Sequence, residues 1–97
     1  MILVTMGARG ALLVTKDELL HAVAPNQRAV QGVATGCGDA ATAGWLWATR
    51  DGCSPGEMLR RAVACGTAKL GSPDPGELSH RHVSALLRRV KIETIPF

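Results

Sequence analysis

The sequence predicts a mixed α/β chain: a short β-meander comes first, three helices follow, and a strand ends the chain. Two patterns support this prediction. Apolar runs at residues 2–6, 11–15 and 19–23 are separated by glycine-rich or polar turns, which is typical of short strands. From residue 40 onward the apolar residues recur at helical spacing, until residues 91–95 alternate again. A length of 97 residues allows a single domain with a small core.

The N-terminal segment predicts three consecutive strands. The first, Ile2 to Met6, is almost entirely apolar, which is typical of a strand covered on both faces. Gly7 and Gly10 allow the positive φ angles of a tight turn into the second strand. The polar residues 16–18 predict the next turn, before the third strand at 19–23. Because the first and last strands have no obvious neighbour along the chain, we expect them to belong to a larger α/β sheet.

Residues 25–33 predict an irregular connection into the first helix. The helix at 40–48 is apolar nearly all round, so we expect it to be buried, with Trp45 and Trp47 as core or interface anchors. Glycine is the usual helix terminator, and we therefore expect Asp51-Gly52 to end this helix.

The second and third helices have clear start signals. Ser54, Pro55 and Glu57 match an N-cap, a first-turn proline and a capping box, and they predict a helix that continues through 58–69. A loop is expected at 71–76, and Ser79 opens the last helix. The apolar face of that last helix comprises Val83, Leu86, Leu87 and Val90. The arginine pairs Arg60-Arg61 and Arg88-Arg89 are expected on solvated helix faces.

Composition excludes several function classes. The net charge is only +3 and aromatic residues make up 3% of the chain, which argues against nucleic-acid binding. The three cysteines form no Cys-x-x-Cys pair, so neither a disulfide framework nor a metal site is predicted. The N-terminus lacks the pattern of a signal peptide, and no apolar stretch is long enough for a membrane helix. We therefore expect a cytoplasmic protein without membrane contact.

The segment most informative about chemistry is Gly36-Cys37-Gly38-Asp39, at the start of the first helix. The two glycines let the backbone approach an anion closely, and a helix N-terminus offers unpaired N–H groups and a positive dipole end. Asp39 is awkward for simple anion binding because its charge repels phosphate. It fits if it accepts a proton from a hydroxyl while the backbone stabilises a moving phosphoryl group.

These four residues alone also allow a purely structural alternative, a loop in which Asp39 caps the helix. Two other phosphate-binding motifs are excluded. No Gly-Lys-Ser/Thr follows, as a Walker loop would require, and the third glycine of the dinucleotide fingerprint is missing.

Two segments in the right order resemble the ribokinase-like (PfkB) family of carbohydrate kinases. Residues 34–44 are similar to the second PfkB signature, whose core is usually written D/N-T-x-G-A-G-D. Residues 4–11 resemble the strand and turn that contact ATP in that family, and residues 62–68 the helix that borders the adenine. The chain's short segments rich in Val and Ala resemble those of the family branch that comprises 1-phosphofructokinases and tagatose-6-phosphate kinases.

The resemblance implies specific roles. Asp39 would be the catalytic base, and the backbone of Gly36, Cys37 and Gly38 would form the anion hole. It further implies ATP with Mg²⁺ as the phosphoryl donor and a sugar or sugar phosphate as the acceptor. The residues that would line the nucleotide are Thr5, Gly7, Arg9, Gly10 and Gly66.

The resemblance also implies a fold and a boundary: residues 1–97 would be the C-terminal, ATP-binding portion of a ribokinase-like α/β sandwich, without the substrate-binding N-terminal part and lid. Val33 and Ala34 replace the polar residues that open the signature, which leaves a monovalent-cation requirement open. An exposed position at a helix end is the expectation for Lys69, with a nucleotide phosphate as the alternative. For the chain by itself, the competing hypothesis is a non-catalytic truncated remnant or a nucleotide-binding module that self-associates into a homo-oligomer.

Overall fold

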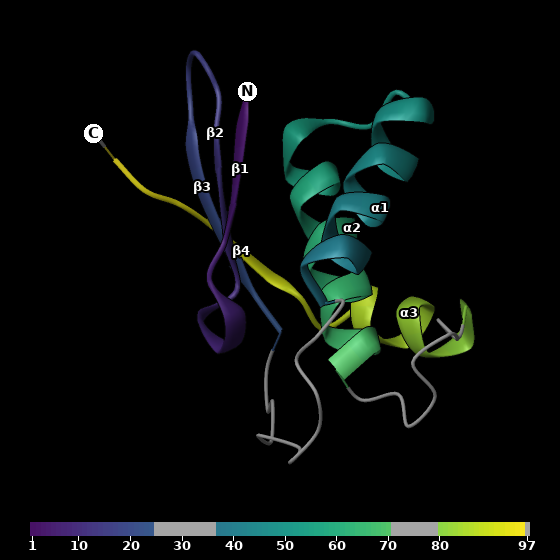
Figure 1. Cartoon of the computed structure of the whole chain (residues 1–97). Coiled ribbons are helices and arrows are strands. Elements are labelled where there is room, and N and C mark those ends of the chain that lie inside the picture. The colour runs from purple at the N-terminus through teal and green to yellow at the C-terminus, as the bar shows by residue number, and fades with distance from the viewer. Residues whose placement is uncertain (25–36, 71–79, 97) are drawn as a thin grey trace.

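The computed structural model describes residues 1–24, 37–70 and 80–96. Figure 1 shows a four-stranded sheet with the helices on one side of it. The sheet order is β1-β2-β3-β4, and each neighbouring pair is antiparallel. The strands are β1 (Ile2–Thr5), β2 (Ala11–Val14), β3 (Leu19–Val23) and β4 (Lys91–Thr94), and the helices are α1 (Cys37–Arg50), α2 (Pro55–Leu70) and α3 (His80–Leu87).

The predicted order of elements is confirmed, including both turns of the meander. A 3-10 turn at Gly7–Arg9 joins β1 to β2. In the next turn, the Thr15 hydroxyl accepts a hydrogen bond from the Glu18 N–H at 2.9 Å. The predicted connection at 25–33, the loop at 71–76 and the helix start at Ser79 lie outside the described residues.

Sheet burial follows the alternation that an antiparallel sheet with one covered face requires. Every second residue of β2 and β3 faces the helices and is buried, while the residues between are half-buried. Helix α2 packs on β2, β3 and β4, and α1 packs on α2. The core thus lies between the sheet and α2; its fully buried larger side chains are Leu13 and Leu59.

The expectation that the first strand is covered on both faces is wrong for this chain. β1 is an edge strand, and Ile2 and Val4 are 60% and 41% exposed. Their side chains lie on the sheet face away from the helices, because their register partners Val14 and Leu12 do. We call this surface the outer face; it comprises Ile2, Val4, Leu12, Val14 and Leu19.

The expectation that the first helix is buried all round is also wrong. Ala41, Gly44 and Ala48 of α1 are buried, whereas Leu46, on another side of the helix, is 61% exposed. The helix fully buries only the small-residue face that meets α2, and Trp47 packs against the core while only partly buried. The apolar composition therefore reflected close helix packing rather than burial on every side.

The predicted end of α1 and start of α2 are confirmed. α1 ends at Arg50, and Gly52 follows with φ +69°. The Ser54 side chain accepts a hydrogen bond from the Glu57 N–H at 3.3 Å, which is the N-cap half of the capping box. The Glu57 carboxylate instead pairs with Arg60 and Arg61 of the next turn.

The final strand finds its neighbour within the chain, since β4 pairs with β3. The Arg60 guanidinium donates to the carbonyl oxygens of Leu87 and Val90, at 3.2 and 2.8 Å, and so ties α2 to the segment that leads into β4. The larger sheet expected around these strands stays a prediction. None of the helices in the described ranges combines the length and apolarity needed to cross a bilayer.

Candidate functional site

The first turn of α1 holds the predicted catalytic base. α1 begins at Cys37, so Gly38 and Asp39 lie in the turn whose backbone N–H groups have no partner within the helix. A Cβ built on Gly38 would meet no atom within 4 Å in the described part of the chain, so the space on that side of the residue is open there. Gly36 and the side chain of Cys37 lie outside what the structure describes.

The Asp39 carboxylate is exposed. Within residues 1–24, 37–70 and 80–96 it makes no hydrogen bond or ion pair, so the capping role that the sequence left open is not seen there. The Thr42 hydroxyl donates to the Gly38 carbonyl oxygen at 3.0 Å, an ordinary bond one helical turn back. A carboxylate without a partner at a helix start is free to accept a proton from a bound hydroxyl.

The turn between β1 and β2 carries four of the predicted nucleotide-side positions. Thr5 ends β1, pairs with Ala11 and lies toward the helix-covered face, since the alternate residues Ile2 and Val4 lie on the outer face. Gly7 and Gly10 have φ +59° and +84°, as the predicted turn requires. Arg9 is exposed.

Position 10 requires a glycine for two reasons, its positive φ angle and the lack of room for a Cβ atom. A Cβ at this position would collide with the carbonyl oxygen of Ala22 on β3. The turn is closed by internal backbone bonds: Gly10 N–H donates to Gly7 O at 3.0 Å, and Met6 N–H to Gly10 O at 2.8 Å. The turn is therefore compact and lies against β3.

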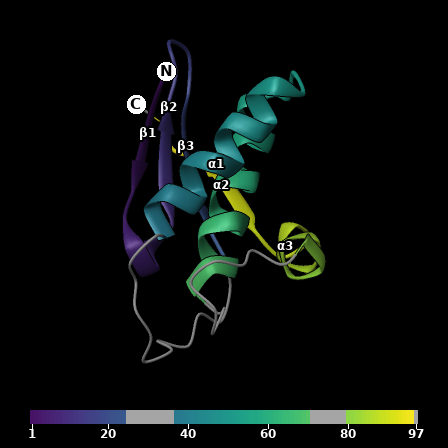
Figure 2. The same cartoon turned by 45° about the vertical axis from the view of Figure 1, so that its right-hand side comes forward.

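The fifth predicted nucleotide-side residue, Gly66, lies on α2 and is half-buried. α1 and α2 run antiparallel, as Figure 2 shows, so the C-terminal half of α2 lies beside the start of α1. Both views also place the Gly7–Arg9 turn at the end of the molecule where α1 starts. The fold thus gathers three segments that are separate in sequence at one end.

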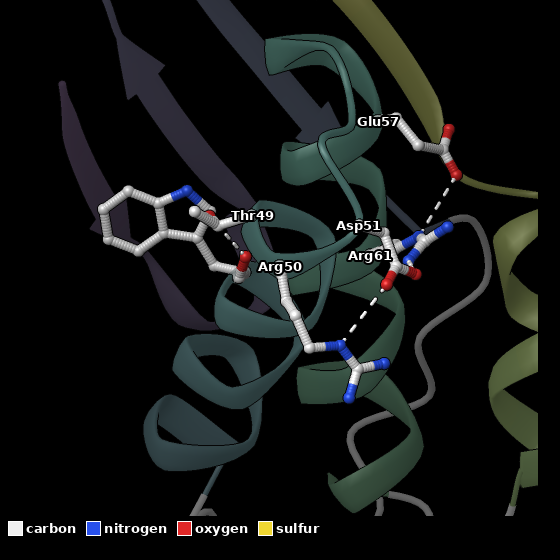
Figure 3. A network of polar contacts seen from close by, with 6 residues as sticks. Thr49, Arg50, Asp51, Glu57 and Arg61 are labelled. Atoms are coloured by element: carbon white, nitrogen blue, oxygen red, sulfur yellow. Dashed lines mark hydrogen bonds and ion pairs between the residues drawn. The ribbon is translucent and has the colours of Figure 1, made fainter.

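The opposite end of the helix pair carries a charged network that the sequence analysis missed. The Arg61 guanidinium lies 2.8 Å from the Asp51 carboxylate and 4.1 Å from the centre of the Trp47 ring. Glu57 approaches Arg61 at 3.7 Å, an ion-pair distance too long for a hydrogen bond. Figure 3 shows Asp51 held between Arg50 and Arg61.

Arg60 and Arg61 are both half-buried, so the prediction that they lie on a solvated helix face is wrong. Arg88 and Arg89 are exposed, as expected. The hydrogen bond from Arg61 holds the pKa of Asp51 below its ordinary value, and the same bond raises the pKa of Arg61. The alternation of charges over Arg50, Asp51, Glu57 and Arg61 was the available signal, but helix periodicity alone does not show that Asp51 folds back onto α2.

Residue types that bind metals do not cluster in the part of the chain that the structure describes. In the described ranges, no three His, Cys, Asp or Glu residues gather closely enough to hold a metal ion. Cys53 and Cys65 are free thiols, and burial raises the pKa of the Cys65 thiol.

Comparisons with known proteins agree in placing this chain. The model of the pfkB family carbohydrate kinases matches residues 1–81. The chain is 41% identical over 70 residues to a 1-phosphofructokinase of Haloferax volcanii. The aligned region covers 72% of this chain and 22% of that relative. It is 34% identical over 96 residues to a 1-phosphofructokinase of Rhodobacter capsulatus, covering 99% of the chain and 30% of that relative.

The same likeness appears in three dimensions. A structure described as a putative phosphofructokinase from Staphylococcus aureus superposes with a TM-score of 0.83 at 30% identity, covering 96% of this chain and 29% of that one. The chain thus spans less than a third of the length of these relatives. A family match over most of the chain and a shared ribokinase-like fold lead to one conclusion: this chain belongs to the pfkB family of carbohydrate kinases.

Proposed function

We propose that this chain is the nucleotide-binding and catalytic-base segment of a kinase that transfers a phosphoryl group from ATP to a hydroxyl of a sugar or sugar phosphate. One observation supports the proposal above others: Asp39 is exposed, without a partner among the described residues, and in the first turn of α1. A carboxylate there can accept the proton of the acceptor hydroxyl, while the N–H groups of the same turn stabilise the charge of the phosphoryl group.

The nucleotide side of this proposal comprises the segments that the fold gathers near the start of α1. Thr5 and the Gly7–Gly10 turn approach from the sheet, and Gly66 from α2. Each glycine offers backbone without a side chain in the way, which suits contact with phosphate or ribose. The end of α2 includes Lys69, for which the nucleotide phosphate remains the alternative to a plain surface position.

ATP would arrive with Mg²⁺, which supplies neutralisation of the phosphate charge during transfer. In such sites Mg²⁺ is held by the substrate phosphates together with one or two protein carboxylates. The residues of this chain would orient the phosphates and receive the proton.

For the acceptor, we propose a phosphorylated ketohexose, since both curated relatives are named 1-phosphofructokinases. The residues that would select this acceptor lie, by our proposal, in the part of the kinase that precedes residues 1–97. The complete enzyme would therefore need that part, in the same chain or in a partner chain. A soluble, cytoplasmic location belongs to the same proposal.

The experiment places this segment in a complete kinase. The 96 residues that align with the Rhodobacter capsulatus 1-phosphofructokinase replace the matching segment of that enzyme, and ADP release is measured with fructose 1-phosphate and MgATP. We expect turnover with wild-type sequence, and a loss of about 10²- to 10⁴-fold for Asp39→Asn with the KM for ATP nearly unchanged. Asp17→Asn, in the β2–β3 turn, is the matched control. Turnover that survives in Asp39→Asn would remove the proposed base.

A second function is favoured by the outer face. Ile2 and Val4 expose much of their apolar surface on an edge strand, which is typical of a surface that pairs with another chain. The chain by itself would then be a self-associating, non-catalytic module. Sedimentation equilibrium of the full chain, with the double variant Ile2→Thr/Val4→Thr as control, tests this: dissociation of an oligomer by the variant supports it, and a monomeric wild type rejects it.

A further inference from the structure

We propose that His21 is a positioning residue that holds the Gly7–Gly10 turn in the shape required at the nucleotide. This inference rests on the proposed function, because the value of a fixed turn depends on a nucleotide that contacts it. His21 lies on β3, outside all segments that resemble a kinase motif.

The evidence is a hydrogen bond between distant parts of the chain. His21 Nε2 lies 2.7 Å from the carbonyl oxygen of Arg9, in the middle of the turn. Among the described residues this is the one side-chain hydrogen bond that reaches the turn, because the others there join its own backbone groups. His21 is therefore the polar tether between the turn and the sheet.

Two contacts from neighbouring residues of β3 act together. The backbone of Ala22 lies against Gly10 and leaves no room for a Cβ. This contact fixes the distance between the turn and β3. The adjacent residue, His21, holds the Arg9 carbonyl, which fixes the rotation of the peptide between Arg9 and Gly10. That rotation decides where the Gly10 N–H and the Arg9 side chain point.

The bond also identifies the tautomer. A carbonyl oxygen can only accept, so Nε2 of His21 carries a proton and donates it. Leu12 on β2 and Glu93 on β4 are the register neighbours of His21, so the imidazole stands between an apolar and an acidic residue. A side chain with a donor at the same reach should replace it, and one without a donor should not. Glutamine is such a substitute, because its amide nitrogen lies about as far along the side chain as Nε2.

The first measurement is backbone hydrogen exchange of the full chain, comparing wild type, His21→Leu and His21→Gln. Because a single hydrogen bond is lost, we expect the Gly10 amide to exchange about three to ten times faster in His21→Leu, and at nearly the wild-type rate in His21→Gln. His80→Leu, an exposed histidine changed on α3, is the matched control. Unchanged exchange at Gly10 in His21→Leu overturns the proposal, whatever the chain binds.

The second measurement is a MgATP titration of the same variants by calorimetry. We expect an affinity about three to ten times weaker for His21→Leu, recovered by His21→Gln, at unchanged far-ultraviolet circular dichroism. Faster exchange with unaltered affinity would overturn the nucleotide role. If the wild type binds no MgATP, the nucleotide role of His21 fails for this chain. The chimeric kinase then decides the proposed function, and the exchange rates alone decide whether His21 holds the turn.

Discussion

Gly44 of α1 lies directly against the backbone of Arg61 on α2: a Cβ built on Gly44 would stand 2.5 Å from the Arg61 carbonyl oxygen. It would also lie 2.9 Å from Sγ of Cys65. The flanking residues on the same face of α1, Ala41 and Ala48, are small and buried. The two helices therefore approach more closely than a larger residue at this position permits, and this approach sets where the start of α1 sits relative to Gly66.

We expect Gly44→Ala to destabilise the chain by about 1 to 3 kcal/mol, because the added methyl forces backbone apart. The melting temperature should fall by at least about 4 °C, as expected for a domain of this size. Gly38→Ala is the matched control: its Cβ meets no described atom, and alanine is the better helix former, so its stability should be equal or higher. Equal melting temperatures for Gly44→Ala and wild type would contradict the close packing.

Gly7 and Gly10 allow the energetic cost of a positive φ angle to be distinguished from the cost of a steric clash. Both Gly7 and Gly10 have positive φ, but only Gly10 faces a backbone atom, at Ala22. We expect Gly7→Ala to cost about 1 kcal/mol, the penalty of the left-handed conformation. Gly10→Ala should cost clearly more, about 2 to 4 kcal/mol, because the turn must also move off β3. Urea denaturation measures both; a smaller loss for Gly10→Ala than for Gly7→Ala would refute the contact.

The Asp51–Arg61 pair predicts a pH dependence. The bond from Arg61 lowers the pKa of Asp51 below its ordinary 3.8, so the folded chain holds the carboxylate charged more readily than the unfolded chain does. The stabilisation is therefore complete above the unfolded pKa and disappears as the pH falls through the folded pKa.

Wild type should accordingly be more stable than Asp51→Asn at pH 7, and the difference should shrink below about pH 4. Thermal unfolding from pH 2.5 to 7 measures this. Asp17→Asn controls for the loss of one carboxylate elsewhere. A stability difference that stays constant to pH 2.5 would mean that the pair does not act through its charge.

The two described thiols should differ in reactivity. Burial raises the pKa of the Cys65 thiol and excludes reagents, whereas Cys53 is only half-buried. At pH 8, iodoacetamide should label Cys53 first, and Cys65 only at the rate of unfolding. Peptide mass spectrometry follows both sites in one sample. Equal labelling of the two in the folded chain would be incompatible with the packing of Cys65 under Gly44.

The meander, the end of α1, the start of α2 and the family were predictable because each has a local signal. Gly7 and Gly10 marked a turn through their φ requirement, and Ser54 marked the start of α2 through its side-chain oxygen. The approximate position of Asp39 at a helix start followed from the glycines before it.

What the sequence could not provide were relationships between elements. The exposure of Ile2 depends on what covers the sheet, and an apolar run looks the same whether or not it is covered. The Arg61–Asp51 pair depends on how the turn between α1 and α2 folds back, and the His21–Arg9 bond depends on strand register. Each of these contacts joins residues whose spacing in the sequence follows neither helical nor strand periodicity.

β4 pairs with β3 across the whole helical part of the chain, joining Lys91 to Val23. During synthesis on the ribosome, the meander and the α1–α2 hairpin emerge before β4 and can form from nearby residues. The sheet cannot gain β4, and Arg60 cannot reach the Val90 carbonyl, until residues 90–94 have left the exit tunnel. The slow step of folding should therefore be this long-range closure, during which the nascent chain would present its apolar strand edge to chaperones.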